Sequence, residues 1–121
     1  MAESARIAEY LEAGLRASSL RQAVIANNIA NMATPGFRRS TLPFEKAFAE
    51  AVARGKPVDH QAVLRHIVQP RTGDLNPFGN DVHIDTEVGE LVKNSMLYTT
   101  YARLLNRMYR QMELAMAPPG A

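Results

Sequence analysis

The chain has 121 residues, of which 46% are apolar, and a formal net charge of +2. This length limits it to one small domain, and its scattered basic residues give no special support to nucleic-acid binding. The absence of cysteine excludes disulfides, thiol catalysis and cysteine-ligated zinc sites. With four phenylalanines, four tyrosines and no tryptophan, the chain suits helix-on-helix contacts better than a thick layered core.

The N-terminal residues are polar and include an early acidic residue, Glu3, instead of the apolar segment of a secretory signal peptide. No stretch of the sequence is apolar for long enough to cross a membrane. If the protein leaves the cytoplasm, we therefore expect it to do so without a cleaved signal peptide.

Residues 4–32 predict the first long helix. Apolar side chains recur there at alternating steps of three and four, which is the spacing of a coiled-coil or bundle seam. The polar residues Ser18 and Gln22 interrupt the seam, and Gly14 weakens the helix locally. This helix therefore needs a packing partner. The seam residues expected to make assembly contacts are Leu11, Leu15, Ile25 and Ile29.

An asparagine-rich run closes this helix. Asn27, Asn28 and Asn31 are poor helix formers, and the Pro-Gly turn of residues 34–36 follows them at once. Capping and solvent exposure explain one such amide. Hydrogen bonds to the returning C-terminal segment or to a neighbouring chain would explain all three, because side-chain amides both donate and accept. From the residues alone, the two interpretations carry equal weight.

The middle segment, residues 33–85, is rich in turn-forming Pro and Gly, and we expect little regular structure there. Its apolar pattern predicts a short helix over 44–54 and a short strand over 63–68. Asp81, His83 and Asp85 occupy every second position and would point the same way in an extended chain, which makes them the best candidates for metal ligands. We favour the interpretation that they are exposed turn residues. No catalytic motif is present, so we expect neither an enzyme nor a cofactor or metal site.

Residues 86–117 predict the second long helix, with Asp85 or Thr86 as its N-cap and acidic residues in the first turn. Its other face carries Lys93, Arg103 and Arg107. The expected fold is mainly α: a single unit, 1–121, whose terminal helices pair as a coiled-coil-like hairpin around the irregular middle. The seam residues expected on this helix are Val88, Leu91, Tyr98, Leu105, Tyr109 and Met112.

Two long helices paired alone bury little apolar surface in water. We therefore expect other subunits to cover the remainder, and the ends of the chain could stay unfolded until then.

The run at 26–37 reads A-N-N-I-A-N-M-A-T-P-G-F. It resembles the signature near the N-terminus of bacterial flagellar rod, hook and hook-associated proteins, A-N-N-I-A-N-x-x-T-P-G followed by an aromatic residue. Carried over to this sequence, the signature residues are Asn27, Asn28, Ile29, Asn31, Thr34, Pro35, Gly36 and Phe37.

A second segment narrows the resemblance to the short rod proteins of this family. It is similar to the G-N-x-V-x-x-D-x-E segment and downstream tyrosine of a proximal rod protein, and the small size of the chain agrees. Another short rod protein is the alternative within the family. The residues of this second motif are Gly79, Asn80, Val82, Asp85, Glu87 and Tyr98.

This resemblance implies a structural role in the proximal rod, the helical drive shaft that transmits torque. It also implies unprocessed secretion through the flagellar type III channel and assembly in the periplasm. The implied partners are other rod proteins, copies of the chain itself, and the membrane-ring and export-gate proteins at the rod base. Neither a small-molecule substrate nor nucleic acid is expected as a partner.

A cytoplasmic helical adaptor or a small basic nucleic-acid-associated protein is the competing hypothesis. Its main support is the positive charge of Arg103, Arg107 and Arg110 on the last helix. It leaves the asparagine-rich run unexplained.

Overall fold

The computed structural model describes residues 2–120, and within this range the chain is built from helices without a strand. In chain order, the helices are α1 (Ala2–Ala30), α2 (Glu45–Ala53), α3 (His60–Leu64) and α4 (Ile84–Met116). The predicted mainly α fold with two long terminal helices is therefore confirmed. None of these helices, within the part of the chain described, is long and apolar enough to span a membrane.

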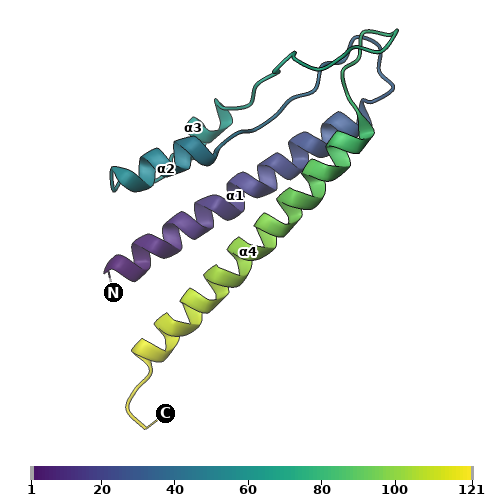
Figure 1. Ribbon diagram of the computed structural model, residues 1–121. Helices are drawn as coiled ribbons and strands as arrows, with labels where there is room; N and C mark the ends of the chain where they lie inside the picture. The colour runs from purple at the N-terminus through teal and green to yellow at the C-terminus, as the bar shows by residue number, and fades with distance from the viewer. Residues whose placement is uncertain (1, 121) are drawn as a thin grey trace.

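The two long helices form an antiparallel hairpin, and α2 and α3 lie along the opposite side of α1 (Figure 1). Three contacts fix the register of the hairpin. Asn28 lies opposite Glu87, Arg21 opposite Asn94, and Gly14 opposite the ring of Tyr101. As a result, the beginning of α1 and the end of α4 lie at the same end of the molecule (Figure 1).

The start of α4 differs from the prediction of an Asp85 or Thr86 N-cap. The helix begins at Ile84, and its N-cap, His83, makes no side-chain capping bond. Asp85 and Glu87 instead lie in the first turn, where a negative charge is favoured by the helix dipole.

The predicted helix over residues 44–54 is confirmed as α2, but the predicted strand over residues 63–68 is wrong. Residues 60–64 form α3, because Asp59 caps that helix by accepting a 3.0 Å bond from the Gln61 N–H. Only Val68 pairs in a β-type manner, through an isolated antiparallel bridge to Thr41.

The apolar core lies mainly between α1 and the middle segment. Phe44 packs edge-on against Phe48 at 5.8 Å, and the Arg21 guanidinium stacks over the Phe44 ring at 4.4 Å. The middle segment is thereby tied to the hairpin. Buried members of this core are Ala17, Leu42, Phe44 and Val63, with Leu20, Phe48, Val58 and Leu97 partly buried around them.

The predicted seam divides into buried and exposed positions. Ile25 and Leu105 are buried. Leu11, Leu15, Ile29, Leu91 and Met112 are partly buried. By contrast, Val88, Tyr98 and Tyr109 are 45%, 41% and 41% exposed.

In the first half of α4, the most deeply buried positions are shifted by about one residue from the predicted seam, whereas Leu105 in the second half is a buried seam residue. Glu87 and Asn94 take inner positions in place of the neighbouring Val88 and Ser95. For the exposed seam residues, contact with a neighbouring subunit stays a prediction.

Candidate functional site

The two sequence motifs meet in space at the turn end of the hairpin. The side-chain amide of Asn80 donates to the carbonyl oxygens of Asn31 and Thr34, at 3.0 and 2.8 Å. The Gly36 N–H donates to the Phe78 carbonyl at 2.8 Å. Two segments more than forty residues apart therefore form one site, and we call residues 27–40 together with 76–87 the motif junction.

Asn28 is the buried centre of this junction. Its Nδ2 donates to the Ser40 carbonyl at 2.8 Å and to Glu87 Oε2 at 3.1 Å, and its Oδ1 accepts the Ser40 N–H at 2.9 Å. Every polar atom of the amide is used, as burial requires. For Asn28, contact with the returning chain and with α4 is therefore the correct interpretation.

The other two asparagines differ from Asn28. Asn31 Nδ2 donates to the Asn27 carbonyl at 2.8 Å and its Oδ1 accepts from the Thr34 hydroxyl at 3.1 Å, so its side chain closes the helix end locally. Asn27 is exposed, and its side chain accepts a long 3.3 Å bond from Asn31. The capping interpretation fits these two residues better.

Four charged groups surround Asn28 and Asn80. The Arg39 guanidinium pairs with the fully buried Glu87 at 2.5 Å, and the Arg39 backbone N–H donates to Asp81 Oδ1 at 2.6 Å. Arg38 Nε lies 3.5 Å from Asp81 Oδ2, where the geometry does not make a hydrogen bond. Two buried carboxylates thus face two arginines, which offsets their desolvation.

Sequence reasoning missed the role of both arginines, although their position directly after the turn was the available signal. Asp81 also departs from expectation, because it is buried, whereas His83 and Asp85 are exposed turn and helix-start residues. No cluster of three potential metal ligands occurs within residues 2–120.

Two glycines with left-handed backbone geometry lie where the two segments meet. Gly36 and Gly79 have φ angles of +74° and +75°, a backbone conformation that residues other than glycine rarely adopt. A Cβ on Gly79 would lie 3.7 Å from the Gly36 Cα. Gly36 therefore supplies a positive φ within the turn of residues 34–36.

The remaining motif residues have different positions. Val82 is buried and Phe37 half-buried, whereas Thr34 and Pro35 are exposed. Tyr98 lies along α4, away from the junction.

A second polar layer lies about two helical turns further along the hairpin. Asn94 is buried, donates to the Ser18 carbonyl and to Gln22 Oε1 at 2.7 Å each, and accepts from Arg21 Nε at 2.8 Å. Arg21 also pairs with Glu45 of α2 at 2.5 Å. Ser18 and Gln22 are therefore partners of Asn94, although their sequence pattern suggested mere interruptions of the seam.

Two tyrosines of α4, Tyr101 and Tyr109, have raised pKa values. Burial raises the pKa of Tyr101, the negative charge of Glu45 raises it further, and Arg21 acts in the opposite direction. The pKa of Tyr109 is also raised, chiefly because its hydroxyl donates to Glu12.

This geometry defines a structural subunit, in which polar layers hold two long helices in one register. A family model described as flagella basal body rod protein matches residues 11–38, which include the asparagine-rich run. The chain is 36% identical over 98 residues to the FlgB rod protein of Borreliella burgdorferi, covering 66% of this chain and 73% of that protein. It is 31% identical over 107 residues to FlgB of Aeromonas hydrophila, and the aligned region covers 76% of this chain and 78% of that protein.

The chain belongs to the FlgB family of flagellar basal body rod proteins. FlgB of Borrelia hermsii is a further relative, 28% identical over 119 residues that cover 79% of this chain and 84% of that protein. The protein is a structural component of the flagellar basal-body rod, where it assembles with other rod components. Neither the cytoplasmic adaptor nor another short rod protein such as FlgC is favoured, since the relatives are FlgB proteins.

Proposed function

We propose that this chain is a subunit of the proximal rod and packs through the outward faces of its long helices. Its partners are other rod proteins, copies of itself, and the membrane-ring and export-gate proteins at the rod base. The observation that carries this proposal is the apolar outer surface of α4. Val92 and Met96 of that helix are 54% and 66% exposed, and Leu114 near its end is 77% exposed.

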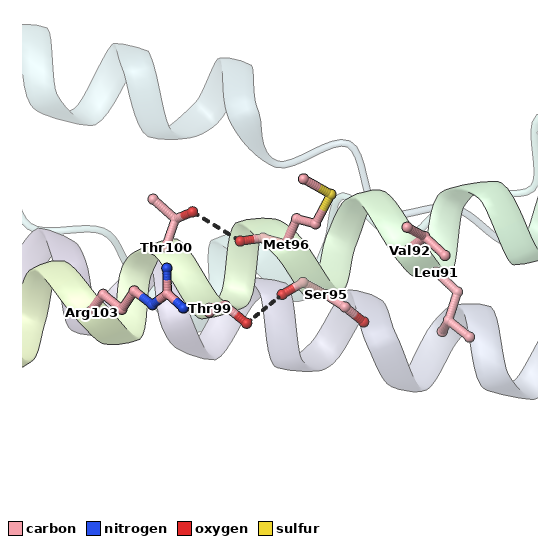
Figure 2. Close-up of a pocket in the computed structure, with 7 residues that line it drawn as sticks. All are labelled: Leu91, Val92, Ser95, Met96, Thr99, Thr100 and Arg103. Carbon is pink, nitrogen blue, oxygen red and sulfur yellow. Dashed lines mark hydrogen bonds between the residues drawn. The ribbon is translucent and has the colours of Figure 1, made fainter.

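The outer surface of α4 is suited to a dry contact. Figure 2 shows the shallow groove that Val92 and Met96 line together with Thr99 and Thr100, with the charged Arg103 at one end. Both threonine hydroxyls donate to carbonyls of their own helix, Ser95 and Met96, at 2.9 Å each. These hydroxyls are therefore already satisfied, and a partner can cover the groove without leaving them unpaired.

The polar layers support the transmission of torque. A buried polar contact fixes the register of paired helices, because sliding one helix would leave its partners unsatisfied. Asn28 with Glu87, and Asn94 with Ser18, act at two heights of the hairpin. A subunit whose helices cannot slide passes a twisting load to its neighbours instead of deforming.

Export in an unfolded form, without a cleaved signal peptide, is part of the same proposal. The buried apolar cluster is small, with only one aromatic side chain among its fully buried members. A small core costs little to unfold before passage through a narrow channel. On this view, the helices gain much of their burial when the subunits meet, so that folding and assembly are coupled.

The proposal predicts that Val92→Asp prevents rod assembly while the chain itself still folds. A charge on the outer face of α4 has to be desolvated at a subunit contact but stays in water in the isolated chain. Val52→Asp on α2 is the matched control, because that valine is 50% exposed and belongs to a different surface. Cells producing each variant in place of the parent are compared for swimming and for rods in isolated basal bodies. Normal rods with Val92→Asp would contradict the proposed contact.

A further inference from the structure

We propose that the outer face of α4 in one copy docks onto the outer face of α1 in a second copy that lies beside it in the same orientation. This inference rests on the proposed function and specifies its partner surface. It follows from the sizes and charges on the two faces and from the register of the hairpin.

The outer face of α4 has an apolar half and a basic half. Val92, Met96, Thr99, Arg103 and Arg107 follow each other at steps of three or four and are all exposed. This is a second helical seam, opposite the one that packs on α1. Its first half presents bulky apolar side chains, and its second half presents guanidinium groups.

The outer face of α1 has the complementary character. Ala23 and Ser19 are exposed small residues in the second half of the helix, whereas the first half carries the exposed Glu9 and the partly exposed Glu12. Glu12 already accepts a bond from Tyr109 of its own chain and lies 4.0 Å from Arg16, so Glu9 is the carboxylate of this face that is open to a neighbour. A groove of about 590 Å³ runs over the small residues, with Tyr98 of α4 also lining it. Leu15, Arg16, Leu20 and His60 complete the lining of this groove, and a neighbouring helix can approach most closely over Ser19 and Ala23.

The register of the hairpin brings these features to the same height. Because Arg21 lies opposite Asn94 and Gly14 opposite Tyr101, Val92 is level with Ala23 and Met96 with Ser19. By the same register, Arg103 is level with Glu12, and Arg107 is within one residue of Glu9. Two copies set side by side without axial displacement therefore place large residues beside small ones and arginines beside glutamates.

The docking is heterologous, because the outer face of α4 is directed away from α1. Each copy can then use its α4 face on one neighbour and its α1 face on another, which continues the array instead of closing it as a pair. A second copy is the occupant that these faces favour, since one chain supplies both complementary faces in a matching register. Arg16 does not oppose this arrangement, because the uncharged Thr99 is level with it.

Cysteine cross-linking tests the docking in assembled rods, and the chain contains no cysteine of its own. In a chain carrying both Met96→Cys and Ser19→Cys, mild oxidation of isolated basal bodies should give dimers and larger species of this chain. The pair Val52→Cys with Ser19→Cys, and Met96→Cys alone, are the controls and should stay monomeric. Dimers from Met96→Cys alone would mean that two α4 faces meet and would overturn the proposal. Rods that form without cross-links would overturn it too, while leaving the rod function intact.

Charge reversal in trans provides an independent test. Arg107→Glu or Glu9→Arg alone should reduce swimming, because like charges then meet across the contact. Co-production of the two single variants should restore swimming, since the reversed α4 of one faces the reversed α1 of the other. A contact within one chain cannot be rescued in this way. Normal swimming by both single variants, or failure of the mixture to improve on either, would contradict the pairing.

Discussion

Asn28 and Asn27 are adjacent in the sequence and identical in chemistry, yet their surroundings differ completely. Asn28 is fully buried and bonded to Ser40 and Glu87, whereas Asn27 is exposed. Burial of a polar group is tolerated only when its hydrogen bonds are made, so the energetic weight of the asparagine-rich run lies on Asn28. At the scale of single residues, the run therefore combines one buried structural anchor, Asn28, with an exposed amide, Asn27, that takes part only in the local closure of the helix end.

This difference predicts that the same substitution has unequal effects at the two positions. Asn28→Ala should lower the free energy of unfolding of the full chain by about 1–3 kcal/mol, because Ser40 and Glu87 lose a buried partner. Asn27→Ala should change it by less than about 0.5 kcal/mol, as is usual for exposed positions. Urea unfolding followed by circular dichroism measures both values. Equal losses in the two variants would show that the junction does not anchor the hairpin.

Tyr101 predicts a loss of stability in alkali. Its pKa is raised in the folded chain, chiefly by burial, so the neutral phenol is favoured by folding. The contribution of Tyr101 to the stability of the folded chain is complete below the ordinary tyrosine pKa of about 10. It is lost as the pH rises through the raised pKa of the folded state. In Tyr101→Phe, the fall in melting temperature between pH 9 and pH 11 should be smaller than in the parent. An unchanged fall would assign the alkaline sensitivity to other groups.

At the scale of elements, the contact of α1 with α4 depends on a small residue at one crossing point. A Cβ placed on Gly14 would lie 2.5 Å from two ring atoms of Tyr101. The glycine that weakens α1 locally is therefore what allows the aromatic ring to pack against the helix backbone.

Gly14→Val should consequently destabilise the full chain by about 1–3 kcal/mol through overpacking. Gly89→Val is the matched control within α4, because an added Cβ there meets no atom within 4 Å. Thermal unfolding of both variants compares their melting temperatures. If Gly14→Val melts no lower than Gly89→Val, the close approach of Tyr101 does not contribute to stability.

The helical elements were largely predictable, because long apolar periodicity is a local property of the chain. Helices expected over 4–32 and 86–117 are observed at 2–30 and 84–116. The segment 63–68 was misassigned because Asp59 supplies a helix cap whose effect the apolar pattern does not register.

The inner face of α4 was misplaced for a related reason. Glu87 and Asn94 are buried through partners that are distant in sequence, Arg39 and Ser18. An inspection of apolar residues alone assigns such polar positions to the surface. The meeting of the two motifs likewise depends on long-range bonds from Asn80, which no local pattern contains.

At the scale of the whole molecule, the interior and the surface have different tasks. Inside, two polar layers and a small apolar core hold one hairpin register. Outside, α4 keeps exposed apolar side chains such as Val92 and Met96, which an isolated small protein has no reason to retain in such number. This division is what a subunit of a shaft requires, because a rigid interior keeps the outer contact faces at fixed positions.

The most direct test of this account is electron microscopy of basal bodies from cells that lack this chain, paired with a swimming assay. We expect these cells to have membrane rings without a rod and not to swim, and we expect the rod and swimming to return when the chain is produced again. Intact rods and normal swimming without the chain would contradict its role as a proximal-rod subunit.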